Sequence, residues 1–365
     1  MKNNILKLFA IAILPFFITV SCNKNDDNEP LTKQEAVKVL ESASQQMGQA
    51  MGELMETDAM QAILNFGNLF YGDEVSTPNI AKTTQELVLL AGKPATKPNL
   101  PSFAFTAKDE VQDTPFGNYG TYTWNPTQMV WTYNPVPTDK AIFKFPSDET
   151  QETNNAVLTL WNVSSFNQEG DEALTSLNLS LSVNNANVLS VFYKLTLDAE
   201  NRFKDLSLTI EMSPFYLSAG INFITNNTGV RLGLNNEMKK EGVTIQSSNL
   251  QMQFMGLELP SLFVEDDGSE PEEDIMPLTV KGFVQMGGLK ITLDLDIAEF
   301  SMAPTPESVS TYANKNLKIS LYAYPAGNKL AYIKWYNMEG GLVPYFVFSN
   351  DEEEPVADFF IYDEF

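Results

Sequence analysis

Apolar and polar residues alternate strictly along five separate stretches of this chain, and this alternation constrains the fold more than any other feature. The stretches are Leu177–Val183, Leu206–Met212, Leu250–Phe254, Leu289–Ile297 and Leu317–Leu321. A period of two places every second side chain on the same face of a β-strand. Each stretch therefore predicts a strand with one leucine-rich face and one polar face. This is typical of antiparallel sheets with one face in a core, because parallel strands buried on both faces are continuously apolar.

The alternating pattern extends from about residue 115 to the C-terminus and is interrupted by turn signals such as Asn184-Asn185 and Gly287-Gly288. Asn and Gly tolerate the backbone conformations of tight turns, so these pairs predict hairpins between strands. We expect residues 115–365 to form one large antiparallel β domain of about ten to fourteen strands. A sandwich, a barrel and a curved open sheet all fit the pattern.

A helical pattern precedes the β domain. Thr32 followed by Glu35 has the form of a capping box, which begins a helix. Apolar residues then recur at spacings of three and four, at Ala36, Leu40, Ala43, Met47, Met51 and Leu54. Residues 31–71 are therefore predicted to form a helical hairpin with a second helix over 58–71. Residues 72–114, which contain Gly and Pro breaks, predict a linker with a short helix over 83–90. The expected fold class is α+β.

The N-terminus predicts export. Lys2 and Lys7 precede an apolar run over 8–20, and the small Ser21 follows it. The run is shorter than the ~20 residues that cross a bilayer, and its order of charge, apolar centre and small residue is typical of a signal peptide over 1–21.

Cys22 is the only cysteine of the chain and directly follows this segment. Thr19-Val20-Ser21-Cys22 resembles the lipobox of bacterial lipoproteins. The resemblance implies that cleavage makes Cys22 the mature N-terminus and that acyl chains on its sulfur and amine attach the protein to a membrane. An ordinary signal peptide with an incidental cysteine is the alternative.

Residues 22–30 predict an acylated, disordered tether, because Asn23 to Pro30 contain no apolar anchor. Lys24 with Asp26 and Asp27 is similar to the export signal of Bacteroidetes surface lipoproteins. That resemblance implies an outer-membrane location facing the cell exterior.

Composition excludes several functions. The chain has no histidine, so a Ser-His-Asp or Cys-His catalytic system and a His-ligated metal site are both impossible. A formal net charge of −24 disfavours nucleic acid as a partner, because binding a phosphate backbone depends on Lys and Arg. We expect no enzyme activity, no cofactor and no metal.

One hairpin concentrates aromatic residues. Within 119–133, a four-residue loop at Asn125 to Gln128 would place Tyr122, Trp124, Trp131 and Tyr133 on one face, with Tyr122 opposite Trp131 and Gly120 opposite Tyr133. An exposed face of this kind could stack on sugar rings or aromatic ligands, whereas an inward face would be core.

Acidic residues gather at three places. Asp294 and Asp296 are two residues apart on the polar face of one predicted strand, about 6.6 Å apart. Glu265 to Asp274 and Asp351 to Glu354 are acidic loops without the spacing of a calcium-binding loop. Solvated surface is the favoured interpretation of all three.

The sequence thus predicts a surface-exposed outer-membrane lipoprotein with a non-catalytic binding domain for a hydrophobic ligand or a glycan. The alternative is a structural or assembly component that docks protein partners in the cell envelope. The two differ in whether the apolar faces leave room for a ligand.

Overall fold

The computed structural model describes residues 31–71, 119–168, 171–226, 229–255, 277–303, 305, 308–338 and 341–359. The expected signal peptide, Cys22, the tether, the 72–114 linker and the acidic stretch 265–274 all lie outside these ranges.

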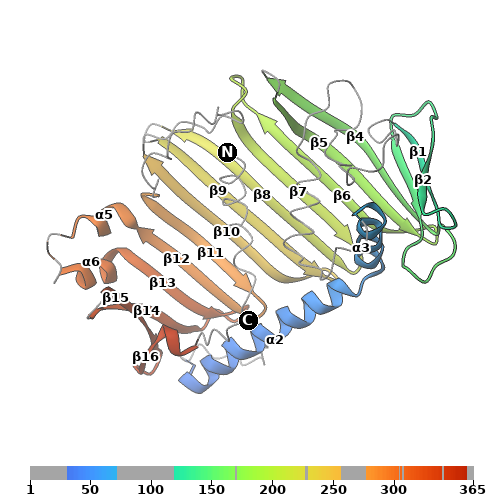
Figure 1. Ribbon diagram of the computed structural model, residues 1–365. Helices are drawn as coiled ribbons and strands as arrows, with labels where there is room; N and C mark the ends of the chain where they lie inside the picture. Colours follow the sequence, from blue (N-terminus) through green and yellow to red (C-terminus); the bar gives the residue numbers. More distant parts are fainter. Residues whose placement is uncertain are drawn as a thin grey trace.

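The described strands form a single sheet of sixteen members (Figure 1). The strands are β1 (Gly120–Asn125), β2 (Val130–Asn134), β3 (Ala141–Phe145), β4 (Ala156–Gln168), β5 (Asp171–Val183), β6 (Ala186–Leu197), β7 (Phe203–Met212), β8 (Phe215–Asn226), β9 (Gly229–Lys240), β10 (Val243–Met255), β11 (Thr279–Met286), β12 (Leu289–Asp296), β13 (Leu317–Ala323), β14 (Lys329–Met338), β15 (Gly341–Phe348) and β16 (Glu353–Pro355). Their spatial order is β16 to β3 without interruption, then β1 and β2. The sheet is not closed, so the fold is a large open sheet preceded by helices.

Nearly all neighbouring strands are antiparallel, as the alternation predicted. The exception is β1, which pairs with β3 in parallel and with β2 in antiparallel orientation. The expectation of about ten to fourteen strands was too low. Strands such as β9 escaped recognition because Gly233, Asn235 and Asn236 interrupt the leucine pattern.

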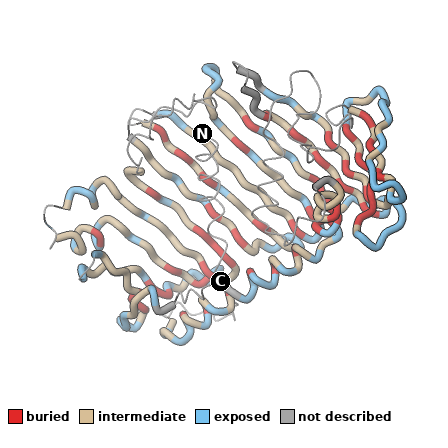
Figure 2. Tube along the Cα trace, viewed as in Figure 1, coloured by how far each residue is buried: buried red, intermediate tan, exposed pale blue. Residues whose placement is uncertain are grey.

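The five alternating stretches lie in β5, β7, β10, β12 and β13, except that Ile297 begins α5 instead of ending β12. Buried and less buried positions follow one another along the strands (Figure 2). In β5, for example, Leu177, Leu179 and Leu181 are buried, and the serine and asparagine residues between them are half-buried. The turn between β5 and β6 has positive φ at Asn184 and Asn185, as expected for a two-residue hairpin turn. We call the leucine-rich side of the sheet the apolar face and the opposite side the polar face.

Both predicted N-terminal helices form and pack on the apolar face. Helix α2 (Lys33–Met55) begins with the predicted capping box, in which Thr32 and Glu35 bond to each other's backbone N–H groups. Helix α3 is Asp58–Tyr71. Figure 1 shows that α2 crosses many strands close to one of their two ends and that α3 lies near β5 and β6.

The buried stripe of α2 is long enough to cross several strands. Its buried apolar residues are Ala36, Val39, Ala43, Met47, Ala50 and Leu54. At 1.5 Å per residue this stripe is about 27 Å long, which corresponds to between five and six strand spacings. One helix can therefore contact strands on both sides of the sheet's centre. Its N-terminal end packs on Leu289, Leu321 and Phe348, and its C-terminal end joins the cluster around Met212 and Phe215.

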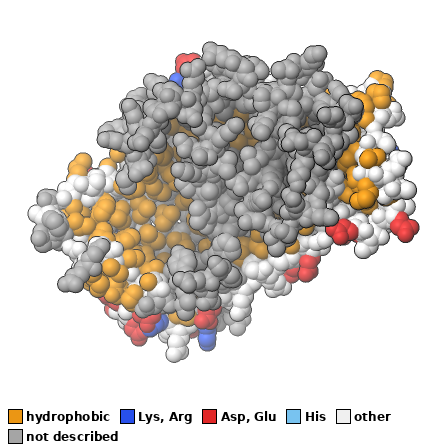
Figure 3. All heavy atoms as spheres, in the orientation of Figure 1, with side chains coloured by type: hydrophobic (Ala, Val, Ile, Leu, Met, Phe, Trp, Pro, Cys, Tyr) orange, Lys and Arg blue, Asp and Glu red, His pale blue; other side chains and the backbone are white. Residues whose placement is uncertain are grey.

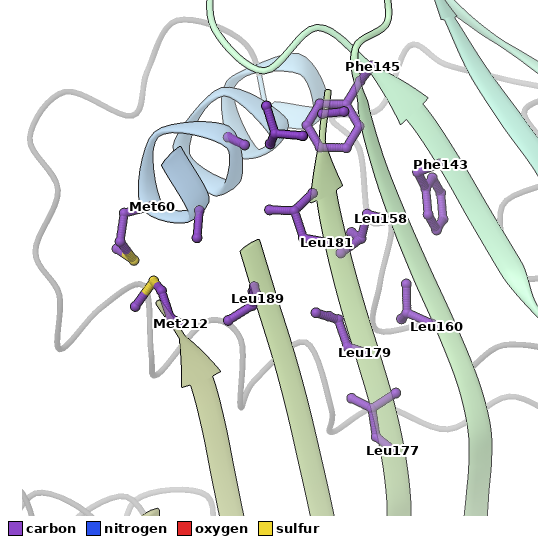
Figure 4. Packing of buried hydrophobic residues seen from close by; sticks show 14 of the residues in the cluster. Met60, Phe143, Phe145, Leu158, Leu160, Leu177, Leu179, Leu181, Leu189 and Met212 are labelled. Carbon is purple, nitrogen blue, oxygen red and sulfur yellow. The ribbon is translucent and has the colours of Figure 1, made fainter. Parts of the chain in front are cut away.

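The larger core lies under α3. Met60 of α3 points toward Met212 of β7, and Leu158, Leu181 and Leu189 line the floor of the same cluster (Figure 4). Phe66 of α3 packs against the ring of Phe145 with centroids 4.9 Å apart. Together the two helices cover one end of the apolar face.

Two short helices flank the opposite strand ends. Helix α5 (Ile297–Ser301) follows β12 directly, and α6 (Val309–Asn316) leads into β13. The 3-10 helix η3 (Val356–Phe359) follows β16.

Candidate functional site

Part of the apolar face is covered less completely than the core under α2 and α3. On β12, β13 and β14, half-buried aliphatic side chains border the cluster under the N-terminal half of α2. We call these residues the open apolar patch: Ile291, Leu293, Leu295, Ile319 and Ile333. Hydrophobic side chains gather on this part of the molecule, around β11–β14 (Figure 3). The patch contains no charged or polar side chain.

Strand register makes the open apolar patch continuous. Leu293 on β12 lies opposite Ile319 on β13 and, on its other side, opposite Gly282 on β11. Gly282 has φ +142°, and a Cβ there would lie 1.9 Å from the Asn249 carbonyl oxygen. Only glycine fits at this position, and its missing side chain leaves the flank of Leu293 uncrowded.

Helix α6 fixes one border of the patch. Asn314 bonds twice to the backbone of Trp335, since its Nδ2 donates to the Trp335 carbonyl at 2.8 Å and its Oδ1 accepts from the Trp335 N–H at 2.8 Å. The Trp335 indole Nε1 donates to the Leu317 carbonyl at 3.1 Å. These bonds hold the helix against β13 and β14 and keep the border rigid.

The aromatic hairpin forms with a register different from the predicted one. Trp124 lies opposite Trp131, and Tyr122 lies opposite Tyr133. The loop begins one residue later than expected because the Asn125 side chain accepts from the N–H groups of Thr127 and Gln128, both at 3.1 Å. Met129 completes the loop with φ +54°. The four rings still share one face, as predicted.

That face points into the core. Tyr122 and Trp124 are buried, and Trp131 and Tyr133 are half-buried. The ring of Tyr122 stacks on Phe143 with centroids 4.8 Å apart, and Phe66 of α3 approaches Trp131 edge-on at 6.0 Å. As expected for an inward face, Tyr133 lies over the gap at Gly120, and its hydroxyl donates to the Tyr119 carbonyl at 2.9 Å. These rings therefore build the packing of the hairpin.

The amide of Gln246 lies buried on the apolar face. Gln246 on β10 is only 1% exposed and pairs with Met238 and Met286 on the neighbouring strands. Neither its Oε1 nor its Nε2 has a hydrogen-bond partner. A buried amide without partners costs stability, so Gln246 is an exception to the pattern of this face.

Tyr193 is a polar residue of the apolar face whose hydroxyl lies in a poorly solvated environment. It lies between Leu177 and Leu208 on the neighbouring strands, and its hydroxyl donates to the Leu174 carbonyl at 3.3 Å. Burial raises the pKa of the Tyr193 phenol to about 12, because the charged phenolate is poorly solvated there.

The acidic residues are held by structural contacts. Asp294 forms an exposed ion pair with Lys281 at 3.0 Å, and Asp296 caps α5 by accepting from the Glu299 N–H at 3.0 Å. Glu354 pairs with Lys33 at the start of α2, which ties the helix to β16. The pKa of the Glu353 carboxyl is lowered by hydrogen bonds from Lys334 and Tyr336. Within the described ranges, no group of three or more acidic or thiol side chains could hold a metal ion.

Sequence reasoning missed a depression on the polar face. It has a volume of about 560 Å³ and is formed by β4, β5, β6 and β7. Its residues are far apart in the sequence, and only strand register brings them together. One signal was present: Phe192 occupies a polar-face position between Ser190 and Lys194.

Of the helices in the described ranges, none combines the length and apolar character needed to span a bilayer. No protein-family model, no curated protein and no solved structure matches this chain.

Proposed function

We propose that this protein is a lipid-anchored outer-membrane protein, exposed at the cell surface, whose sheet binds a hydrophobic ligand without catalysis. The observation that carries the proposal is the open apolar patch on β12–β14, whose five aliphatic side chains stay partly exposed in the described structure. Contiguous apolar surface on a soluble domain marks a site of interaction.

The ligand is expected to be an aliphatic chain or a fused apolar ring system. The five patch residues are branched aliphatic side chains, and they present neither a hydrogen-bond donor nor an acceptor. Apolar contact therefore dominates recognition. Burying a chain against this patch gains about 25 cal/mol for each Å² removed from water.

A matched pair of variants on β12 tests the proposal. Leu293 and Thr292 are neighbours on opposite faces of the strand, and both are half-buried. We expect Leu293→Asn to weaken binding of palmitate by about tenfold, which corresponds to about 1.4 kcal/mol, and Thr292→Asn to leave it unchanged. Calorimetric titration with palmitate, a lysophospholipid and a sterol measures the effect, and thermal unfolding confirms that both variants fold. Equal affinities of the two variants, or no binding of any of the three probes, would refute the proposed function.

The anchor is tested separately. Replacement of Cys22 by Ser removes the expected acylation site, so the protein should move from the membrane fraction to the soluble fraction of the envelope. Retention in the membrane fraction would contradict lipid anchoring and leave the ligand proposal intact.

Assembly with an envelope protein is the second candidate. It is favoured by the edge strand β2, which among the described strands pairs with β1 alone. An unpaired edge can accept a strand from a partner. Thr132→Pro on this edge should abolish capture of such a partner and should not change palmitate binding.

A further inference from the structure

The depression on the polar face is separate from the open apolar patch, and we propose that it binds a glycan. We call it the polar cup. Its walls come from β4 and β5 and its floor from β6 and β7. Its lining includes Asn162, Ser164, Ser176, Asn178, Phe192 and Lys194.

Two register irregularities, one in β4 and one in β5, shape the wall of the cup. The register between β4 and β5 shifts between Trp161 and Ser164 and again between Ser164 and Ser165. Asn162 has φ +53°, a left-handed conformation that asparagine tolerates. A bulge bends its strand and re-aims nearby side chains, so β4 departs here from the regular sheet surface.

The bulge is held by short hydroxyl contacts. The Ser176 hydroxyl donates to the Asn162 carbonyl at 2.7 Å. Ser164 Oγ lies 2.7 Å from Ser176 Oγ and 2.8 Å from Thr175 Oγ1. This wall is therefore built before any ligand arrives, which lowers the entropy that binding must overcome.

Phe192 supplies an open aromatic surface on the floor. It is 40% exposed, although its strand neighbours on this face are polar. Elsewhere on the polar face an ammonium group lies over the ring: Lys290 over Phe283 at 4.4 Å, and Lys329 over Tyr332 at 4.5 Å. In the described part of the chain, neither a second ring nor a lysine covers Phe192 in this way.

Groups that can bond to hydroxyls surround the ring. Asn178 and Thr209 lie opposite Phe192 on the two neighbouring strands, and Lys194 is two residues along the same strand. Ser176 and Ser207 lie opposite Lys194. Hydroxyl and amide side chains both donate and accept hydrogen bonds, as the hydroxyls of a sugar do. The lining contains no carboxylate.

This combination favours a glycan over other ligands. A pyranose ring has an apolar C–H face that can lie on an aromatic ring and a rim of hydroxyls that can bond to the surrounding side chains. A phosphate-rich ligand would need several cations, and the lining provides one lysine in a chain of net charge −24. A lipid tail would need apolar walls, and these walls are Ser, Thr and Asn.

Trp161 extends the site. It occupies the polar face of β4 opposite Asn178, which in turn lies opposite Phe192. The two aromatic residues are thus two strand spacings apart, about 10 Å. With the Asn178 amide oriented to accept from the Trp161 indole N–H at 3.3 Å, the two side chains hold each other in place. We infer that the ligand is an oligosaccharide that reaches both rings.

The test uses the full chain and a panel of unbranched cello-, xylo-, manno- and malto-oligosaccharides. We expect saturable binding of at least one of them by calorimetry at about 10 mM, a concentration that saturates a site with a Kd of about 1 mM. Phe192→Ala should weaken this binding by at least about tenfold, because the stacking surface is lost. Phe192→Tyr keeps the ring and should bind within about threefold of the wild type.

The matched control is Phe283→Ala, which removes a ring from the same face of the sheet outside the cup. It should bind like the wild type, and thermal unfolding should show that the Phe192 variants remain folded. The proposal fails if no oligosaccharide of the panel binds, or if Phe192→Ala and Phe283→Ala bind equally well. Because Phe192 lies on the face opposite the open apolar patch, palmitate binding by Phe192→Ala should be unchanged whichever result is obtained.

Discussion

The two faces of this sheet obey opposite rules, and each contains one residue type that belongs on the other. The apolar face carries the leucines that pack under α2 and α3, yet it buries the amide of Gln246. The polar face carries serine, threonine and asparagine, yet it exposes the ring of Phe192. Exceptions to the pattern are places where stability and recognition can be told apart.

The exceptions differ in what they cost. An exposed ring on the polar face sacrifices little stability, since its strand neighbours do not depend on it for packing. A buried amide without partners loses its bonds to water and receives none in return. We therefore expect the two faces to respond differently to the same substitution.

The largest expected difference in stability between the two faces comes from truncating one phenylalanine on each of them. Phe143 on β3 is fully buried and stacks on Tyr122, and the ring of Phe66 on α3 approaches it edge-on with centroids 5.5 Å apart. Phe143→Ala should lower the free energy of unfolding by about 3–5 kcal/mol, because it removes a large side chain and leaves a cavity. Phe192→Ala should change it by less than about 0.5 kcal/mol. Urea unfolding of both variants measures the difference, and comparable losses would contradict the division between the faces.

A smaller effect of opposite sign is expected at Gln246. Gln246→Met replaces the buried amide by an apolar chain of similar length among Met47, Met238 and Met286. Removing the unpartnered donor and acceptor should raise the free energy of unfolding by about 1–3 kcal/mol.

The control for Gln246 lies on the same strand. Gln251 is exposed on the polar face, so Gln251→Met should change the free energy of unfolding by less than about 0.5 kcal/mol. The urea midpoints of the two variants give the comparison. If Gln246→Met lowers the free energy of unfolding, the amide of Gln246 stabilises the folded protein and the prediction is wrong.

The sequence predicted which side of each strand is buried better than it predicted how the strands pair. Alternation over Leu177–Val183 and Leu289–Ile297 identified strands and their buried sides, because burial acts on each strand separately. The aromatic hairpin was assigned the wrong register because the Asn125 side-chain bonds decide where its loop begins. The parallel pairing of β1 with β3 and the openness of the sheet depend on contacts between strands, which alternation does not encode.

The polar cup could not be predicted for the same reason. Phe192, Asn178 and Trp161 become neighbours only through the register of β4, β5 and β6. The bulge at Asn162 that shapes the wall has no marker in the sequence beyond asparagine's tolerance of positive φ. Phe192 at a polar position was the single local signal, and it indicates an exposed ring without indicating what surrounds it.

The smallest predicted effect is a pH dependence on the apolar face. Burial raises the pKa of the Tyr193 phenol to about 12, above its value of about 10 in an unfolded chain. The folded state therefore holds this proton more tightly than the unfolded state. The stability contributed by neutral Tyr193 is complete below about pH 10 and is lost as the pH rises toward about 12.

Replacing Tyr193 by Phe removes this titration. At about pH 11, the wild type should have lost about 1 kcal/mol relative to Tyr193→Phe, compared with their difference at neutral pH. Lysines and the other tyrosines titrate in both proteins, so the difference between the two urea midpoints isolates Tyr193. If the difference does not change with pH, the Tyr193 phenol is solvated in the folded protein. The packing of Leu177 and Leu208 beside Tyr193 would then not exclude water from its hydroxyl.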